Sequence, residues 1–204
     1  MTPERSPDRD AALRALLPHV ADHGWRWEAL VAAGFDRLDA ELLFPGGTAD
    51  LLDAWCDLAD RDMEAAAIAH GVADQRLSRR VHTLIALRLA NAAPHRDAMR
   101  RAVGMFALPR YAPLAARCAA RSVDAIWHAA GDSSADFSWY TKRAILAGVW
   151  TSTLLFWLGD DSDDDVATLA FLDRRLAGVA QIGKLRGRIS GALARFRPGT
   201  AEAA

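Results

Sequence analysis

The chain has 204 residues, of which 51% are apolar, and its formal net charge is −1. The length predicts one domain, or a small module fused to a larger one, and the composition predicts a sizeable core and excludes an intrinsically disordered protein. The two cysteines, Cys56 and Cys118, lack a CxxC pattern, so they make neither a disulfide framework nor a zinc site and suit a reducing compartment.

The small net charge hides a large difference between the two ends. Residues 1–60 carry 5 basic and 12 acidic side chains, a balance of −7, whereas residues 174–204 carry 7 basic and 1 acidic, a balance of +6. An acidic head is repelled by phosphate, and a basic tail is attracted to anionic surfaces. The charged first residues lack the apolar core of a secretory signal, and their acidic groups argue against a transit peptide. We therefore expect a protein of the bacterial cytoplasm, or of the mitochondrial matrix side if eukaryotic.

Good helix formers dominate the chain, and no alternating β-branched run appears. Glycine and proline mark the breaks, and Thr48 and Asp164 are placed to cap the helices that follow them. The sequence predicts an all-α fold with helices over residues 8–23, 26–33, 39–44, 48–69, 73–91, 94–108, 111–130, 136–158, 164–181 and 182–196.

The first helices resemble the helix-turn-helix module of TetR-type regulators over roughly residues 10–55, most specifically at Phe44-Pro45 followed by Leu51-Leu52. In such a motif the second helix enters the major groove of DNA. Three acidic side chains accompany a single cation in that region of this chain: Asp36, Asp39, Glu41 and Arg37. Because acidic groups lose the attraction to phosphate, we expect a retained module that no longer binds nucleic acid. A TetR-type ligand-responsive repressor is the alternative.

The segment Gly131–Asp165 joins a polar lead-in, an aromatic and basic cluster and an apolar run that stops at an acidic stretch. Its first part, GDSSADFSWYTKRAILAGV, and the later FLDRR at residues 171–175 resemble the coenzyme Q biosynthesis protein nine family; the similarity covers residues 122–176. That family is similar to TetR regulators in fold, acts as a homodimer, binds lipids and does no known chemistry itself. The resemblance implies an accessory protein of ubiquinone synthesis. It would bind an isoprenoid quinone intermediate or a phospholipid and present the quinone to a carboxylate-bridged di-iron hydroxylase.

Aromatic and basic side chains occupy the first turns of the helix predicted over residues 136–158. Large aromatics and arginine dominate the energetics of protein interfaces. The alternative is that Trp139 and Tyr140 are half-buried core residues with their polar tips in water. The family's docking surface falls on this motif, so the resemblance assigns partner binding to Asp136, Trp139, Tyr140 and Arg143.

The apolar run that follows covers most of the helix circumference, which predicts burial on several sides. Packing against neighbouring helices or a dimer mate would explain this pattern. The functional alternative is a cavity for an isoprenoid tail, since ligand sites are mostly apolar. On that alternative the lipid-binding residues are Leu146, Val149, Trp150, Thr153, Leu154 and Trp157. The acidic stretch at residues 160–165 lacks the glycine and closing glutamate of an EF-hand, so we expect a solvated loop and helix cap.

The last segment places an apolar stripe opposite cations, a pattern typical of a helix that lies in a membrane interface. An ordinary amphipathic helix packed on its own domain is the alternative. The family's terminal helix touches membrane, so peripheral attachment to the inner membrane is expected through Ile182, Lys184, Leu185, Arg186, Arg188, Ile189, Leu193 and Phe196. We divide the chain into a helix-turn-helix-like module (residues 1–55), a lipid-binding and dimerisation domain (56–178) and this tail (179–204).

Catalytic and metal-binding motifs are missing from the sequence. None of the five glutamates has Glu-x-x-His spacing, so the chain cannot build a di-iron carboxylate site of the helical-bundle type. P-loop, GxGxxG and nucleophile-elbow motifs are also absent. We therefore expect no enzymatic activity, metal or cofactor; an unrecognised enzyme is the third hypothesis.

Overall fold

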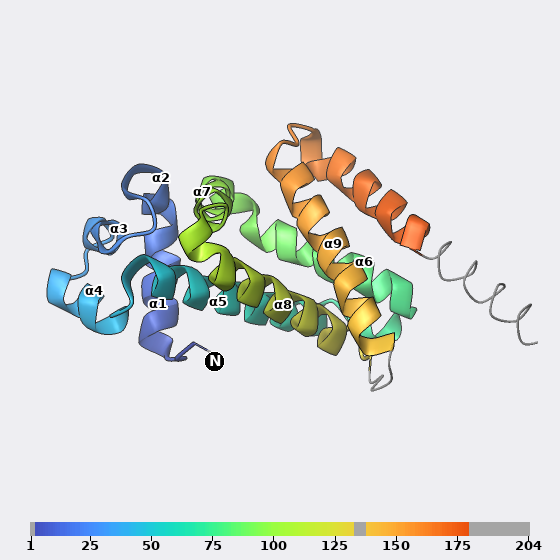
Figure 1. Cartoon of the computed structure of the whole chain (residues 1–204), viewed down its shortest axis with the longest axis horizontal. Coiled ribbons are helices and arrows are strands. Elements are labelled where there is room, and N and C mark those ends of the chain that lie inside the picture. Colours follow the sequence, from blue (N-terminus) through green and yellow to red (C-terminus); the bar gives the residue numbers. More distant parts are fainter. Residues whose placement is uncertain (1–2, 133–137, 180–204) are drawn as a thin grey trace, which may run out of the picture.

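A module of short helices begins the chain and lies at one end of the molecule (Figure 1). The computed structural model describes residues 3–132 and 138–179, and these residues confirm the all-α prediction. The module contains α1 (Pro7–Leu16), α2 (Val20–His23), α3 (Trp27–Ala32) and α4 (Arg37–Leu43).

The predicted helix over residues 8–23 is interrupted in the structure. A 3-10 turn, Leu17–His19, separates α1 from α2. Pro18 lies in this turn, and its ring clashes with the carbonyl four residues earlier, so the α-helix ends there. Ser6 begins α1 by accepting a 3.1 Å hydrogen bond from the backbone N–H of Arg9.

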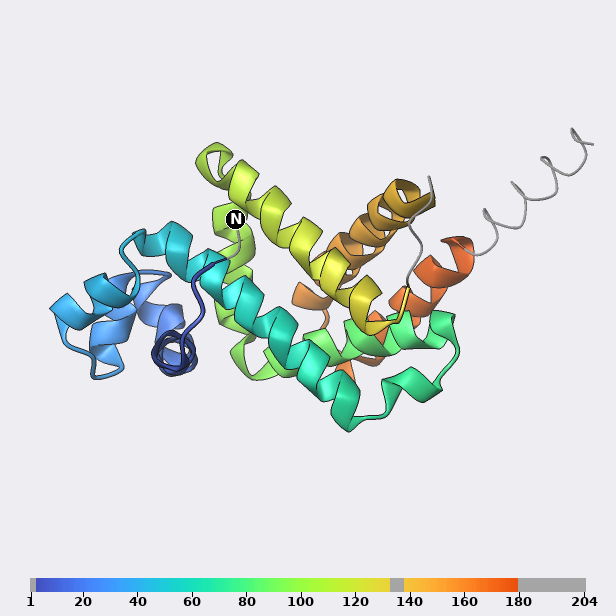
Figure 2. The same cartoon turned by 90° about the horizontal axis from the view of Figure 1, so that it is seen from below.

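The long helix α5 (Gly47–Ala69) connects the module to the remaining helices, as Figure 2 shows. The expectation that Thr48 caps this helix was wrong, because Gly46 occupies the cap position. Gly47 has φ +59°, a left-handed conformation that glycine adopts without strain. The indole Nε1 of Trp27 donates a 2.9 Å hydrogen bond to the carbonyl of Phe44, which fixes α3 against this turn.

The bundle consists of α5, α6 (Leu77–Ala92), α7 (Arg96–Phe106), α8 (Ala112–Ala129), α9 (Ser138–Leu158) and a last described helix over residues 166–179. Helix α5 packs against α6 and α8, and α9 packs against α8 (Figures 1 and 2). The core contains leucines and aromatics from both parts of the chain, including Leu13, Leu52, Leu84 and Trp157. Since α5 runs through residue 55, one helix spans the predicted boundary between the module and the domain.

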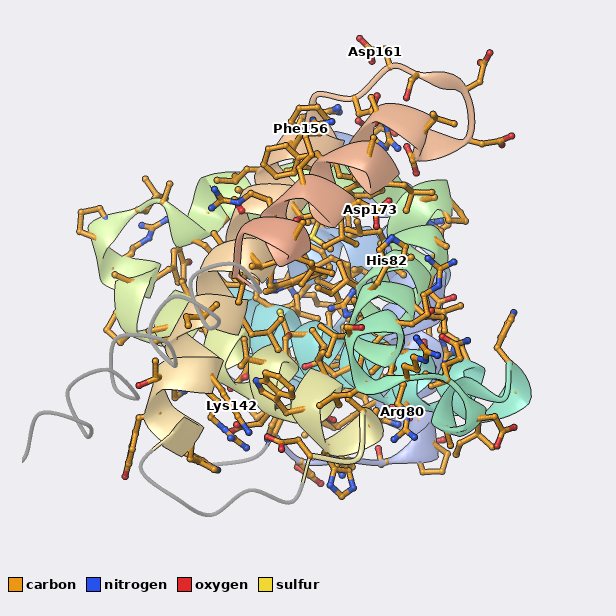
Figure 3. All side chains as sticks on the ribbon, turned by 90° about the vertical axis from the view of Figure 1, so that its right-hand side faces the viewer. Arg80, His82, Lys142, Phe156, Asp161 and Asp173 are labelled. Atoms are coloured by element: carbon orange, nitrogen blue, oxygen red, sulfur yellow. The ribbon has the colours of Figure 1, made fainter. Side chains whose placement is uncertain are left out.

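The expectation of a solvated acidic loop was wrong for part of residues 160–165. Asp160 is only 6% exposed, and its Oδ2 accepts hydrogen bonds from the backbone N–H and the hydroxyl of Thr168 at 2.7 and 2.5 Å. Asp165 accepts a 2.8 Å hydrogen bond from Trp157 Nε1. Asp164 does not cap the last helix: it has φ +52°, and residue 166 is the first residue of that helix. Asp160 is buried because N–H and O–H donors surround it, Asp165 is partly buried, and Asp161 is exposed at the outer edge of the molecule (Figure 3).

The last described helix is held against α6 and α9 (Figure 3). His82 Nε2 of α6 lies 3.3 Å from Asp173 Oδ1. Phe156 of α9 stacks on Phe171 with ring centroids 4.5 Å apart. Burial lowers the pKa of His82, and Asp173 opposes this effect. The helix that precedes the predicted membrane-binding tail is therefore fixed to the bundle.

Candidate functional site

A cavity of about 320 Å³, which we call the central cavity, lies among α5, α6, α7, α8 and α9. Its walls are mostly apolar, and small side chains of α8 leave room between the larger ones. Ligand sites of proteins have such walls and volumes upward of about 300 Å³. The apolar wall residues are Met99, Val103, Phe106, Ala115, Ala116, Ala119, Trp150, Leu154 and Leu155.

Polar groups line one part of the central cavity and connect α5, α6 and α8. Arg88 Nε donates a 3.1 Å hydrogen bond to Asp60 Oδ1, and the hydroxyl of Ser122 donates to the same carboxylate at 2.8 Å. Burial raises the pKa of Asp60, while the charge of Arg88 opposes this effect. The cavity thus combines apolar walls with a buried, charge-balanced polar cluster.

Both cysteines also line the central cavity. They are free thiols, and both are buried. A hydrogen bond with Cys118, together with burial, raises the pKa of the Cys56 thiol well above its usual value. A protonated, buried thiol is a poor nucleophile, so the pair contributes packing rather than covalent chemistry.

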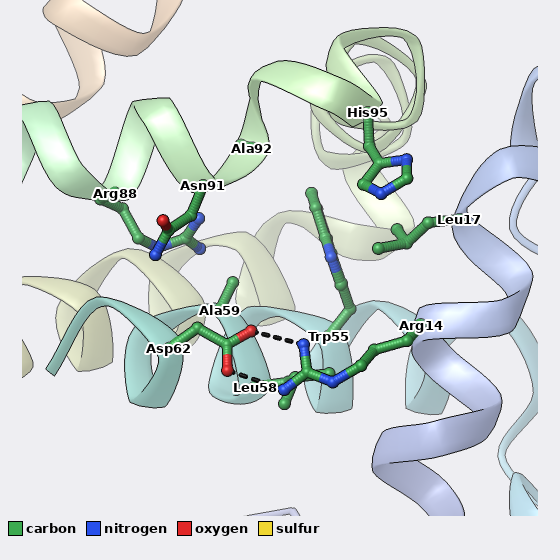
Figure 4. Close-up of a pocket in the computed structure, with 10 residues that line it drawn as sticks. All are labelled: Arg14, Leu17, Trp55, Leu58, Ala59, Asp62, Arg88, Asn91, Ala92 and His95. Carbon is green, nitrogen blue, oxygen red and sulfur yellow. Dashed lines mark hydrogen bonds and ion pairs between the residues drawn. The ribbon is translucent and has the colours of Figure 1, made fainter. Parts of the chain in front are cut away.

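A second cavity of about 240 Å³, the polar cavity, is lined by side chains of α1, α5 and α6, among them Arg14, Trp55 and Arg88 (Figure 4). Trp55 and Arg88 line both cavities. An ion pair between Arg14 and Asp62 at 2.8 Å borders the polar cavity, and His95 faces it from the start of α7. Burial lowers the pKa of His95, so its imidazole is held neutral over a wider pH range.

A third cavity of about 260 Å³, the lateral cavity, is lined by α6, α8, α9 and the last described helix. Trp127 and Ile145 contribute apolar surface to it. Lys142 lies at this cavity and also 3.4 Å from Asp132. The lateral cavity borders Val179, the first residue of the predicted tail and the last described residue.

The predicted lipid-binding residues divide into three groups in the structure. Trp150 and Leu154 line the central cavity, whereas Leu146 and Val149 line the lateral cavity. Thr153 and Trp157 are completely buried and line neither of these two cavities of the described chain. Different faces of α9 therefore line the two apolar cavities, and the remaining two residues pack inside the core.

Three of the four predicted partner-binding residues lie in the first turns of α9. Tyr140 is 72% exposed, and its ring makes an edge-on contact with Trp139 at 4.7 Å between centroids. The guanidinium of Arg143 lies 3.7 Å from the centre of the Trp139 ring and pairs with Asp124 of α8 at 2.5 Å. An exposed aromatic thus stands beside a half-buried Trp–Arg stack. Asp136 lies outside the described residues.

The predicted membrane-binding residues, from Ile182 to Phe196, also lie outside the described residues. Within the described ranges, no helix is long and apolar enough to cross a membrane. The described residues likewise contain no group of three or more His, Cys, Asp or Glu side chains placed to hold a metal ion.

The sequence analysis missed several residues of the central cavity. Met99, Val103 and Phe106 belong to α7, whose apolar positions face the bundle, but their periodicity predicts only a buried face. Nothing in the sequence around Ser122 indicates that it lines a cavity. The sequence around Arg88 does give an indication, since Arg88 is a charged residue inside the apolar run Leu84–Ala90.

Comparison with known proteins identifies similar sequences and a similar structure. Residues 112–183 match the COQ9 family model. The chain is 32% identical to ubiquinone biosynthesis protein COQ9-A, mitochondrial, of Xenopus laevis, covering 84% of this chain and 57% of that protein. It is 32% identical to the coq9 protein of Schizosaccharomyces pombe, covering 85% and 70%, and 29% identical to human COQ9, covering 84% and 57%. The chain thus spans little more than half the length of the frog and human relatives.

Among solved structures, the TetR transcriptional regulator from Nitrosomonas europaea superposes with a TM-score of 0.71 and 25% sequence identity. The match covers 86% of this chain and 99% of that protein. It confirms the predicted TetR-like architecture.

Proposed function

Because the chain belongs to the COQ9 family of ubiquinone biosynthesis proteins, we propose that it is a lipid-binding accessory protein of this pathway. It binds an isoprenoid quinone intermediate and presents it to a di-iron hydroxylase partner. The chemistry of hydroxylation belongs to that partner, and this chain acts as a homodimer at a membrane surface.

The observation that carries this proposal is the central cavity. Its walls are apolar side chains from α7, α8 and α9, and a polar cluster occupies one part of it. The free energy of an apolar tail falls when the tail leaves water for such walls. A few polar groups then determine which head group binds. At about 320 Å³ the cavity suits a ring with a short length of tail, so a long chain extends beyond it.

Partner docking is proposed at the surface formed by Trp139, Tyr140 and Arg143. Exposed tyrosine and an arginine held in a fixed orientation are typical of interface anchors. The surface and the central cavity share α9, since Trp150 and Leu154 lie further along the same helix. A ligand in the cavity and a partner on the surface therefore contact one continuous element.

Membrane association is proposed for the basic tail that follows the last described helix. The lateral cavity borders Val179, where the predicted tail begins. Several curated relatives are named as mitochondrial proteins, which agrees with attachment to the matrix side of the inner membrane in a eukaryote. In a bacterium the corresponding site is the cytoplasmic face of the inner membrane.

Mass spectrometry of lipids extracted from the purified protein tests the proposal. We expect a co-purified prenylated quinone or quinone precursor in the wild type. Ala119→Phe, which fills the central cavity from α8, should reduce that lipid at least about tenfold, because the cavity no longer has room for it. Ala120→Phe is the matched control, since the neighbouring residue is exposed and does not line the cavity. A wild type without lipid, or equal lipid in both variants, would contradict the proposal.

A ligand-responsive repressor is the second candidate function, favoured by the structural similarity to a TetR regulator. The same cavity would then bind an inducer. The surface of α4 argues against this role, because its cation is already paired: Arg37 contacts Glu28 at 2.8 Å and Glu41 at 2.5 Å.

A further inference from the structure

Arg88 is a buried cation with a single hydrogen-bond partner among the described residues. It is 3% exposed and lies in the middle of α6. A guanidinium has five N–H donors. The only hydrogen bond that the described residues provide is the one from Nε to Asp60, and Nη1 is buried without an acceptor. Burying an unsatisfied donor is costly, so proteins rarely leave one in place without a ligand or another partner.

Arg88 lies where a ligand could supply the missing acceptor. Arg88 lines both the central and the polar cavity, together with Trp55; Figure 4 shows the two side chains at the polar cavity. Trp150, an apolar wall residue of the central cavity, places its ring 5.7 Å from the guanidinium. A ring that enters the central cavity therefore meets aromatic side chains and the N–H groups of Arg88 at the same place.

The charges around Arg88 indicate what kind of acceptor fits. Asp60 is also buried and forms an ion pair with Arg88 at 3.1 Å. Arg121 lies 4.0 Å from the same carboxylate, but it is itself paired with Asp53 at 2.8 Å. Ser122 donates to the same carboxylate and thereby holds it in place. A second anion, such as a phosphate, would be buried without a free counter-charge, which is costly. A neutral oxygen, by contrast, accepts a hydrogen bond and adds no charge.

We propose that Arg88 anchors the ligand's head by donating a hydrogen bond to a neutral ring oxygen, a quinone carbonyl or a phenol. Trp55 and Trp150 hold the ring, and the apolar walls of the central cavity hold the start of the isoprenoid tail. This assignment rests on the proposed lipid-binding function and makes Arg88 a specificity-determining residue of that site.

Binding of three probes with the same ten-carbon geranyl tail tests the assignment: a ubiquinone with two isoprene units, geranylbenzene and geranyl monophosphate. Isothermal titration gives the dissociation constants, and quenching of tryptophan fluorescence checks them, because Trp55 and Trp150 line the cavity. We expect the wild type to prefer the quinone over geranylbenzene by about tenfold or more, since a hydrogen bond from a charged donor is worth at least that factor. Geranyl monophosphate should bind more weakly than the quinone.

The double variant Arg88→Met, Asp60→Asn removes the donor without leaving a buried aspartate unpaired. It should bind geranylbenzene as the wild type does and lose the preference for the quinone. Arg14→Met is the matched control, because Arg14 is an arginine that lines the polar cavity and not the central one. That variant should keep the preference.

The outcomes separate this inference from the proposed function. Equal binding of quinone and geranylbenzene to the wild type, or an unchanged preference in the folded double variant, overturns the role of Arg88 and leaves lipid binding standing. Tighter binding of geranyl monophosphate overturns the neutral head and indicates a phospholipid ligand. A wild type that binds none of the three probes overturns both proposals.

Discussion

The indole Nε1 of Trp157 donates a 2.8 Å hydrogen bond to Asp165, and Arg96 of α7 pairs with the same carboxylate while lying 4.4 Å from the indole ring. Three segments of the chain thus meet at one buried tryptophan: the end of α9, the start of α7 and the residues that lead into the last described helix. This contact orients α9, which carries side chains of both apolar cavities and of the proposed docking surface.

We predict that Trp157→Phe lowers the free energy of unfolding by about 1–3 kcal/mol, because Asp165 loses a buried hydrogen bond and the smaller ring leaves a void. Denaturant unfolding measures the change. Asp161→Asn alters an exposed carboxylate of the same segment and should leave the free energy of unfolding nearly unchanged. Equal stability of Trp157→Phe and wild type would show that the contact is dispensable.

The stability contributed by Asp160 should depend on pH. Hydrogen bonds from Thr168 and Ser162 hold the pKa of Asp160 below its ordinary value of 3.8. A carboxyl whose pKa is lowered by folding stabilises the folded state above its unfolded pKa, and this contribution is lost as the pH falls through the folded value. Asp160→Asn should therefore lower the melting temperature at pH 7, and its difference from wild type should shrink below about pH 3.8. If the difference in melting temperature between Asp160→Asn and wild type stays constant from pH 7 to pH 3, the charge of Asp160 does not stabilise the fold.

Trp139→Lys should abolish binding of the di-iron hydroxylase while leaving thermal stability nearly intact. The new ammonium group would face Arg143, which lies over the native ring, and the aromatic anchor would be lost. Tyr140→Ala should weaken binding at least about tenfold, since Tyr140 is exposed and available to a partner. Surface plasmon resonance with the purified hydroxylase measures both effects.

Leu42→Lys is the control for these docking variants, because Leu42 is an exposed apolar residue on α4, in the N-terminal module at the other end of the molecule from α9 (Figure 1). It should bind the hydroxylase as the wild type does. A large fall in the melting temperature of Trp139→Lys would instead assign Trp139 to the core, the alternative that its half-buried position leaves open.

Operator DNA should not bind with high affinity at physiological salt. The exposed side chains of α4 include Leu38 and Leu42, and Arg37 is held by Glu28 and Glu41. Because Arg37, the cation of α4, is already paired, the counterion-release contribution of this helix to DNA binding is small. Electrophoretic mobility shift with a genomic fragment library measures the affinity; nanomolar binding that weakens steeply with salt would revive the repressor hypothesis.

The predicted helix caps at Thr48 and Asp164 were wrong because the local sequence at each position is compatible with two structures. Thr48 follows two glycines, and the left-handed Gly47 moved the start of α5 ahead of it. Asp164 lies among several aspartates, and hydrogen-bond donors decided which of them are covered: Ser162 and Thr168 for Asp160, Trp157 and Arg96 for Asp165. Arg96, 69 residues before Asp165, selected that residue, and no local pattern carries such information.

The sequence by itself determined the all-α class, most helix positions and the family, because helix propensity, apolar periodicity and the motif around Trp139 are local properties of the chain. The tertiary structure decided how the apolar face of α9 is divided. Residues that form one apolar run in the sequence line two different cavities or fill the core, since each helix face meets a different neighbour. It also decided that Arg88 lies between two cavities beside Asp60, because residues from separate helices define a cavity and its polar groups.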